Sequence, residues 1–170
     1  VKPAATFPIT FSQPGQPGCR HSEQMDWSRK AKSEYRWLVC VDGSEPSARA
    51  FNRLLCLLRL MKEKSSISVL MVTYLPQGDG SAEYREAKAL IVEAMEGYCK
   101  ILEEIGVRNE AKVVENESKV GPAICRLAVE SHIDEIILGN TGKSAVERWL
   151  LGSTSEHCVR HASCAVVVVK

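Results

Sequence analysis

Apolar residues recur with two different periods along most of the chain, and this predicts alternating strands and helices. Five short runs are rich in β-branched and other apolar residues, and turn residues follow several of them. We expect strands at residues 35–41, 67–75, 111–115, 135–138 and 165–169. Because these runs are nearly continuous rather than alternating, they are typical of a parallel sheet that is covered on both faces.

The segments between the runs have helical spacing. Ser44 suits the N-cap of a first helix with Pro46 in its first turn. A long helix is expected over 82–105, ended by Gly106. Its predicted apolar face is Ala87, Leu90, Ile91, Ala94, Met95, Tyr98, Ile101, Leu102 and Ile105. A third helix opens at Gly121-Pro122, and a short fourth helix covers 153–161.

Residues 1–34 differ from the rest of the chain. They hold four of the seven prolines and show no apolar periodicity, so they are predicted to form a flexible extension outside the core. We expect its deletion to change stability by less than about 1 kcal/mol. Residues 35–170 are predicted to be a single α/β domain.

Charge and composition exclude several classes of partner. The chain has 22 Lys and Arg against 21 Asp and Glu, which gives no field that favours nucleic acid or an anionic membrane. No apolar run approaches the roughly 20 residues of a membrane-spanning helix. Seven cysteines without a C-x-x-C pair favour free thiols in a reducing compartment, so we expect a cytoplasmic location.

Two loops carry the candidate chemistry. In parallel sheets ligands bind at the carboxyl ends of strands, where the strand order reverses. Val41-Asp42-Gly43-Ser44 follows the first expected strand. Gly139-Asn140-Thr141-Gly142-Lys143-Ser144 follows the fourth, and Gly152-Ser153-Thr154-Ser155 opens the last helix. Glycines that allow close backbone approach, beside a helix N-terminus, indicate a phosphate site.

Three other sites are rejected on spacing. A phosphate-binding P-loop ending in Gly142-Lys143-Ser144 would need glycine at position 137, where the chain has Ile137. A G-x-G-x-x-G dinucleotide motif is missing after the first expected strand. His157 and His161 lie one helical turn apart near two cysteines, but Cys164 falls beyond the helix, so we expect no protein-built metal site.

The spaced glycine motifs resemble those of a known family. Gly139-x-x-Gly142, nine residues and then Gly152-Ser153 is similar to the nucleotide-binding signature of the ATP-binding universal stress proteins. Val41-Asp42-Gly43-Ser44 resembles their first-strand motif, and Val120-Gly121-Pro122 is also similar. The resemblance covers about residues 35–170.

The resemblance implies a single Rossmann-like (HUP-type) domain, with a five-stranded parallel sheet in the order 3-2-1-4-5 and helices on both faces. It also implies that Asp42 lies near the adenosine, that Val72 offers backbone groups to the adenine, and that Gly139 and Gly142 line the ribose and first phosphate. Lys143 is either a phosphate contact or a solvated loop lysine. The expected ligand-binding set is Val41, Asp42, Gly43, Ser44, Val72, Gly139, Asn140, Gly142, Lys143, Gly152, Ser153 and Thr154.

Two functions remain open. The resemblance implies ATP, with AMP or ADP as alternatives, and Mg²⁺ held mainly by phosphate oxygens and water. The chain is expected to be a nucleotide-dependent regulatory module of the stress response; the alternative is a slow ATPase or a self-phosphorylating enzyme with Ser153 or Thr154 as acceptor. The apolar fifth strand, 165–169, lies at a sheet edge in the implied order and predicts a homodimer.

Overall fold

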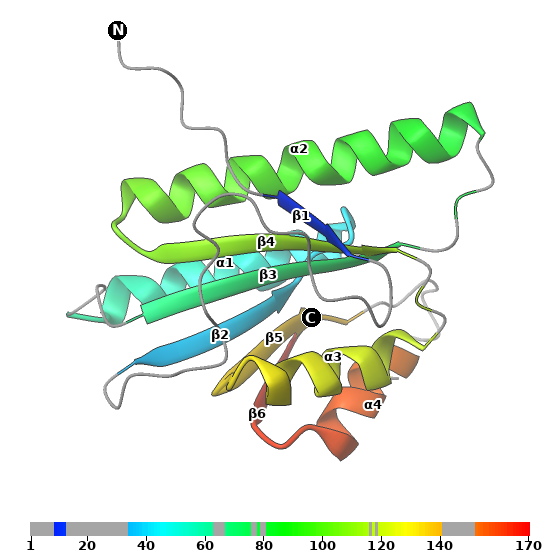
Figure 1. Cartoon of the computed structure of the whole chain (residues 1–170). Helices are drawn as coiled ribbons and strands as arrows, with labels where there is room; N and C mark the ends of the chain where they lie inside the picture. Colours follow the sequence, from blue (N-terminus) through cyan, green and yellow to red (C-terminus); the bar gives the residue numbers. More distant parts are fainter. Residues whose placement is uncertain are drawn as a thin grey trace, which may run out of the picture.

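The chain folds around one all-parallel sheet, which we describe from a computed structural model that covers residues 9–12, 34–62, 67–75, 78, 81–115, 117, 119–140 and 152–170. The order of the strands is β1-β4-β3-β2-β5-β6 (Figure 1). The strands are β1 (Ile9–Ser12), β2 (Tyr35–Cys40), β3 (Ile67–Leu75), β4 (Arg108–Glu115), β5 (Glu135–Gly139) and β6 (Ala165–Val169). The five strands expected from the sequence therefore stand in the expected order, 3-2-1-4-5, with β1 added at one edge.

Within the described residues, four helices cover the two faces of the sheet. They are α1 (Glu45–Leu60), α2 (Ala82–Glu104), α3 (Val120–Glu130) and α4 (Ser153–His161). Helices α1 and α2 pack on one face, and α3 and α4 pack on the other (Figure 1). Each face has its own apolar core, because side chains of successive strand residues point to opposite faces. Both faces are covered, which explains why the strands read as continuous apolar runs.

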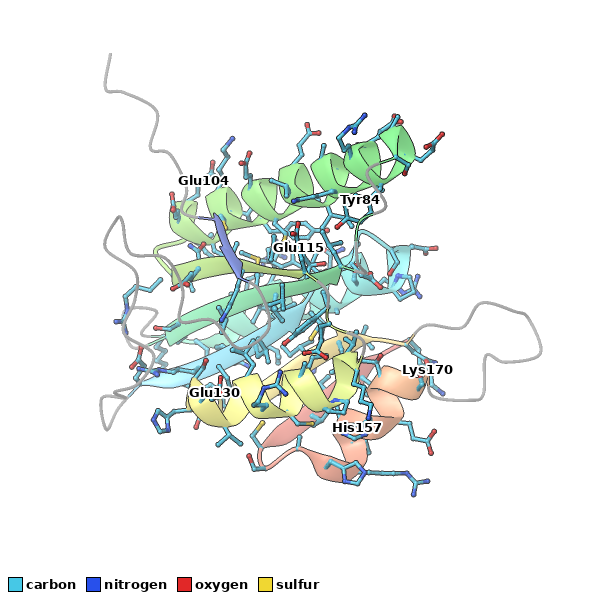
Figure 2. All side chains as sticks on the ribbon, turned by 45° about the vertical axis from the view of Figure 1, so that its right-hand side comes forward. Tyr84, Glu104, Glu115, Glu130, His157 and Lys170 are labelled. Carbon is cyan, nitrogen blue, oxygen red and sulfur yellow. The ribbon has the colours of Figure 1, made fainter. Side chains whose placement is uncertain are left out.

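The long helix α2 is only half packed. Figure 2 shows it running along one side of the molecule from near Tyr84 to Glu104, with many side chains standing out from it. Its fully buried residues, Met95, Cys99 and Leu102, all lie in its second half. The predicted apolar face is wrong at Leu90, which is 60% exposed, at the exposed Ala87 and, near the end of the helix, at Ile101, which is 38% exposed. Side chains in the first half of α2 therefore bury less surface than their spacing suggests.

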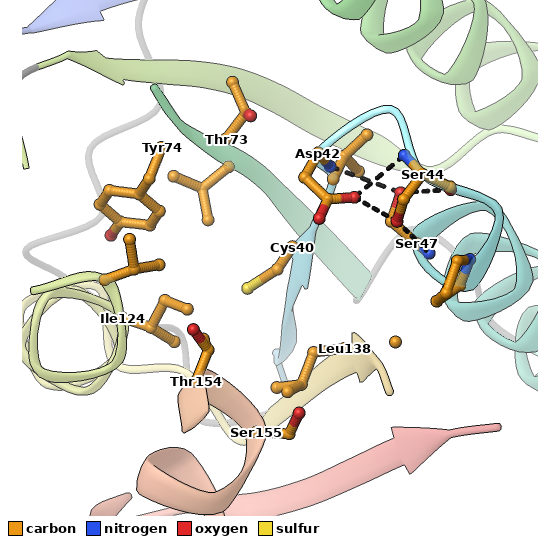
Figure 3. Close-up of a pocket in the computed structure, with 15 residues that line it drawn as sticks. Cys40, Asp42, Ser44, Ser47, Thr73, Tyr74, Ile124, Leu138, Thr154 and Ser155 are labelled. Atoms are coloured by element: carbon orange, nitrogen blue, oxygen red, sulfur yellow. Dashed lines mark hydrogen bonds between the residues drawn. The ribbon is translucent and has the colours of Figure 1, made fainter. Parts of the chain in front are cut away.

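The carboxyl ends of β2, β3 and β5 meet at one edge of the sheet (Figure 3). Strand β3 continues beyond β2, because the last residue of β2, Cys40, pairs with Val72 while β3 runs on to Leu75. The chain turns from β2 into α1 at this edge, and α4 begins beside the end of β5. A crevice opens here, since strands on the two sides of β2 connect through helices on opposite faces.

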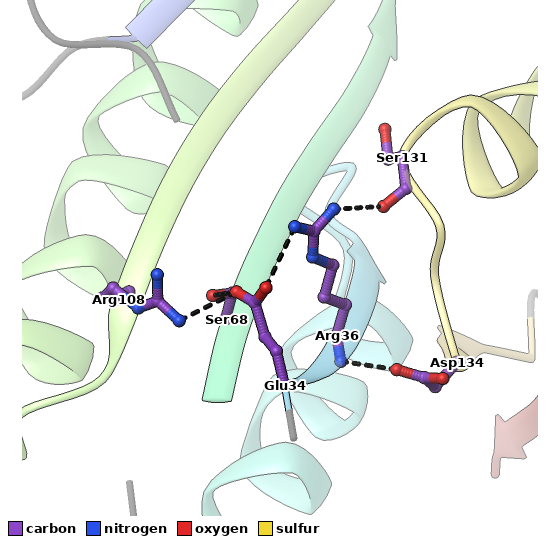
Figure 4. Close-up of polar contacts among 6 residues, drawn as sticks. All are labelled: Glu34, Arg36, Ser68, Arg108, Ser131 and Asp134. Atoms are coloured by element: carbon purple, nitrogen blue, oxygen red, sulfur yellow. Dashed lines mark hydrogen bonds and ion pairs between the residues drawn. The ribbon is translucent and has the colours of Figure 1, made fainter. Parts of the chain in front are cut away.

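At the amino-terminal ends of the strands, opposite the crevice, lies a buried ion network centred on Glu34 (Figure 4). The Glu34 carboxylate accepts hydrogen bonds from Arg36 at 2.9 Å, from Ser68 at 2.5 Å and from Arg108 at 2.8 Å. These partners lie on β2, β3 and β4, so one carboxylate joins three strands. Glu34 was expected to belong to the extension, and this is wrong because its side chain is buried within the domain.

The first residues of β2 are also held from the α3 side. The backbone N–H of Arg36 donates to Asp134 at 2.8 Å, and its guanidinium donates to the backbone oxygen of Ser131 at 3.0 Å (Figure 4). The segment from α3 to β5 is thereby fastened to the start of β2. A buried guanidinium with several acceptors avoids the cost of an unpaired buried charge.

Strand β1 lies within the segment that the sequence predicted to be a structureless extension. Its four residues pair in parallel with β4, from Ile9 opposite Ala111 to Ser12 opposite Val114. The prediction is therefore wrong for Ile9–Ser12, which form the sixth strand of the sheet. Apart from β1, residues 1–33 lie outside the described part of the chain.

Candidate functional site

The turn between β2 and α1 holds a carboxylate in a fixed position. Asp42 accepts two hydrogen bonds at Oδ1, from the Ser44 backbone N–H at 3.0 Å and from the Ser44 hydroxyl at 2.5 Å. Ser44 is also the N-cap of α1, since its Oγ accepts from the Ser47 N–H. Gly43 adopts φ +76°, a left-handed conformation that suits glycine. Among the described residues no hydrogen bond is made to Oδ2 of Asp42, so this oxygen can accept from a ligand.

On the other side of the crevice, Asn140 connects the end of β5 to the start of α4. Its Oδ1 accepts from the Gly152 N–H at 3.3 Å, and its own N–H donates to the Val169 oxygen at 2.8 Å. Gly152 is the N-cap of α4 and supplies no side-chain cap. The first backbone N–H groups of α4 are therefore available to an anion, and the helix dipole favours negative charge there.

A pocket of about 200 Å³ lies between these two elements (Figure 3). One part is an apolar wall made of Cys40, Val72, Tyr74, Val120, Ile124 and Leu138. The other part is a polar rim made of Asp42, Ser44, Ser47 and Thr154. Val41, Pro46, Thr73, Gly139 and Ser155 complete the described lining. A mainly apolar pocket with a few convergent polar groups is typical of a small-molecule site.

Half of the predicted ligand-binding residues line this pocket, and they are Val41, Asp42, Ser44, Val72, Gly139 and Thr154. Gly152 and Ser153 lie at the start of α4, beside the lining residues Thr154 and Ser155. Asn140 holds Gly152 in place, as described above. Gly142 and Lys143 lie outside the described residues, so their predicted roles stay predictions.

Three of these residues also have structural roles that the sequence did not reveal. A Cβ on Gly139 would lie 2.4 Å from the backbone of Pro46, so glycine here lets α1 approach β5. The Val72 carbonyl, expected to face the adenine, accepts from the Val41 N–H at 2.9 Å. A Cβ on Gly43 would lie 3.1 Å from Ile91 of α2.

Most residues of the apolar wall were not predicted from the sequence. Cys40 and Tyr74 belong to strands that read as continuous core, and Ile124 and Leu138 follow the same apolar pattern. The usable signal was their position, since Cys40 and Leu138 stand near the carboxyl ends of β2 and β5.

The thiol and the phenol that line the pocket are both uncharged. Burial raises the pKa of the Cys40 thiol well above its usual range, with the neighbouring Cys158 adding to the effect. Burial likewise raises the pKa of the Tyr74 phenol. Both groups are neutral at physiological pH, so Asp42 is the charged side chain among the described lining residues. The pocket therefore favours a ligand with a large uncharged part and polar groups directed towards the rim and α4.

No group of three or more histidine, cysteine, aspartate or glutamate side chains in the part that the structure describes is arranged to hold a metal ion. No described helix has both the length and the apolar character needed to cross a membrane.

The sheet order, the two-sided helix cover and the crevice at the reversal of strand order define an open, doubly wound α/β protein with a small-molecule pocket. The sequence profile of the universal stress protein family matches residues 35–170. A putative universal stress protein of Staphylococcus haemolyticus is 33% identical over 136 residues, which cover 78% of this chain and 82% of that protein. The chain therefore belongs to the universal stress protein family.

Solved structures share the same fold. A universal stress protein family protein from Arabidopsis thaliana with AMP bound has a TM-score of 0.61 and 25% identity, and the match covers 80% of this chain and 91% of that one. The universal stress protein from Archaeoglobus fulgidus in complex with dAMP has a TM-score of 0.56 and 21% identity, covering 81% and 99% of the two chains. The second match supports the fold alone.

Proposed function

We propose that this chain binds an adenine nucleotide, ATP in the first place, and acts as a nucleotide-dependent regulatory module in a stress response. The observation that carries the proposal is the pocket between Asp42 and the start of α4, with its apolar wall. A carboxylate can accept hydrogen bonds from ribose hydroxyls, and uncapped helix N–H groups bind phosphate. The Arabidopsis relative with bound AMP supports the same assignment.

We propose that Mg²⁺ binds only together with the phosphates. Asp42 is the single carboxylate among the described lining residues, and its Oδ1 already accepts from Ser44. Mg²⁺ prefers several oxygen ligands and keeps some of its waters, so phosphate oxygens would supply most of its coordination. We also propose that the protein is cytoplasmic and forms a homodimer that pairs through β6.

Calorimetry with purified protein tests the site. We expect ATP to bind with Kd in the range of about 1–100 μM. Asp42→Asn removes the charge and should weaken binding about tenfold, because hydrogen bonds to a charged group are stronger than neutral ones. Gly152→Val places a branched side chain at the start of α4 and should abolish binding while the fold persists.

Glu45→Gln is the matched control for Asp42→Asn, because the Glu45 carboxylate lies on the same turn and is 85% exposed. It should leave ATP affinity unchanged. If both Asp42→Asn and Gly152→Val bind ATP as the wild type does, the site is assigned to the wrong residues. Extraction of nucleotide from freshly purified protein identifies whether ATP, ADP or AMP is resident.

One observation favours the catalytic alternative. The Thr154 hydroxyl points into the pocket from the start of α4 (Figure 3), where it could accept a phosphoryl group. Mass spectrometry after incubation with ATP and Mg²⁺ would detect phospho-Thr154, and release of phosphate would detect turnover. Asp42→Ala serves as the control in both assays. A regulatory module predicts that the wild type gives no more product than this variant.

A further inference from the structure

Tyr74 is the aromatic residue of the apolar wall, and the proposed function gives it no role. Strand β3 extends beyond the end of β2, because the last paired residue of β2, Cys40, lies opposite Val72 and β3 continues past it. Tyr74 lies two residues further, on the same face as Val72. Its ring therefore borders the crevice instead of lying beside a residue of β2.

The surroundings of Tyr74 suit a flat, uncharged ligand group. Figure 3 shows the ring on one side of the pocket above Ile124, with Asp42 and Ser44 on the other side and Thr154 below. Tyr74 is only partly buried, so one part of the ring packs on the core and another part faces the pocket. The phenol is neutral, because burial raises its pKa.

An aromatic ring that lines an apolar pocket and is only partly buried offers a stacking surface to a heteroaromatic base. Polar partners lie across the pocket, where Asp42 can accept from ribose hydroxyls and the start of α4 can donate to phosphate. The two parts of a nucleotide thus have separate places. We infer that the Tyr74 ring is the contact surface for the nucleobase and sets a preference for purine over pyrimidine nucleotides. This inference rests on the proposed function.

The preference follows from contact area. A purine has two fused rings and can cover more of the Tyr74 ring than a pyrimidine can. Removing the aromatic ring should therefore weaken purine binding more than pyrimidine binding. A tyrosine that only closes the apolar core on the α3 side would affect stability and leave this ratio unchanged.

The test is calorimetry of ATP and UTP binding to wild type, Tyr74→Leu and Tyr74→Phe. Tyr74→Leu should bind ATP about tenfold more weakly and UTP only about twofold more weakly, as expected for loss of base–aromatic stacking. Tyr74→Phe keeps the ring and should stay within about twofold of wild type for both ligands. Tyr35→Leu is the matched control, because Tyr35 is a partly buried strand tyrosine at the opposite edge of the sheet.

The outcomes separate the inference from the proposed function. If the wild type binds neither ATP nor AMP, the proposed function itself fails. If the wild type binds ATP while Tyr74→Leu keeps the wild-type ratio of UTP to ATP affinity, the Tyr74 inference alone is overturned. A loss in Tyr74→Phe equal to that in Tyr74→Leu would assign the effect to the hydroxyl and also overturn the role of the ring.

A measurement on the unmodified protein covers the case in which Tyr74→Leu does not fold. With ¹³C-labelled tyrosine and bound AMP, isotope-filtered NMR should show contacts between the Tyr74 ring protons and H2 or H8 of the base. The four tyrosines of the chain are few enough to assign, and Tyr35, Tyr84 and Tyr98 serve as internal controls. Bound AMP without a contact to Tyr74 contradicts the inference.

Discussion

The contact between Gly139 and Pro46 limits what residue 139 can be. A Cβ at position 139 would lie 2.4 Å from the Pro46 carbonyl carbon and oxygen, which are backbone atoms that cannot rotate away. Gly139→Ala should therefore lower the free energy of unfolding by about 3 kcal/mol, at the upper end of ordinary overpacking. Urea denaturation of the purified variant measures the loss.

Gly97→Ala is the matched control for this prediction. Gly97 lies inside α2, and a Cβ there meets no atom within 4 Å. Alanine should therefore stabilise the protein by up to about 1 kcal/mol through its higher helix propensity. If Gly139→Ala proves as stable as wild type, the close approach of α1 and β5 is wrong. Because Gly139→Ala is expected to disturb the fold, it is a poor variant for testing ligand binding.

Single residues also show how far the sequence predicts the site. The turn residues Asp42 and Ser44 are predictable, because a polar turn after an apolar strand stands out along the chain. Tyr74 and Cys40 are not, because a strand residue that lines a pocket has the same composition as one that fills a core. These two residues line the pocket because β2 ends at Cys40 while β3 extends further. The relative length of the two strands depends on their register and not on local sequence.

At the scale of elements, a deletion experiment can measure how much β1 contributes to stability. It contributes only four residues, and all of its pairing is with β4. Because β1 belongs to the sheet, the limit of about 1 kcal/mol expected for loss of the whole extension is replaced by a larger one: removing residues 1–12 should cost about 1–2 kcal/mol. Each backbone hydrogen bond contributes about 1 kcal/mol net, and chain entropy offsets part of the sum. Hydrogen exchange should accelerate at amides within 111–114 and stay unchanged in β2.

The matched control for this experiment is deletion of residues 1–8, which leaves Ile9–Ser12 in the chain. This shorter deletion should retain both the stability and the exchange pattern of the wild type. Equal behaviour of the two truncated proteins would show that β1 adds nothing to the sheet. The sequence could not predict β1, because a four-residue strand becomes stable only through a distant partner.

The Glu34 network, which joins three strands, predicts that the stability of the fold depends on pH. Burial raises the pKa of Glu34, but hydrogen bonds from Ser68 and Arg36, together with the charges of Arg36 and Arg108, outweigh burial and lower it below 4.5. Because the folded-state pKa lies below the unfolded value, the carboxylate stabilises the fold above about pH 4.5. This contribution is lost as the pH falls through the folded-state pKa.

Glu34→Gln should therefore destabilise the protein by about 2 kcal/mol near neutral pH, and by much less near pH 3. Urea midpoints at the two pH values measure the difference. Glu45→Gln, at the exposed side chain noted above, should show no such change with pH. A Glu34→Gln penalty that is the same at both pH values would contradict the ionised network.

At the scale of the whole molecule, the open edge at β6 determines how two copies could pair. The Ala165 N–H donates to the Asp134 oxygen at 3.2 Å, and the Val169 oxygen accepts from Asn140. Backbone groups of alternate residues in a strand point to the same side. Those of Ala165, Val167 and Val169 therefore face β5, and those of Val166 and Val168 face outward.

This alternation decides which proline substitution tests the homodimer. Val168→Pro removes an outward donor and should shift a dimer to monomer at micromolar concentration in light scattering, with the fold retained. Val167→Pro removes a donor to β5 and should lower stability as well. A wild-type protein that is monomeric at these concentrations would contradict pairing through β6.

The pairing of β1 with β4 also has a consequence for the order in which the chain can fold. Ile9 pairs with Ala111, so roughly a hundred positions separate the partners, whereas β2 and β3 are joined by α1 alone. During synthesis β1 is made about a hundred residues before β4, so it has no partner strand until then. We expect the β2-α1-β3 unit to form early and β1 to join the sheet late. Until then, the edge of β4 is open to strands of other chains.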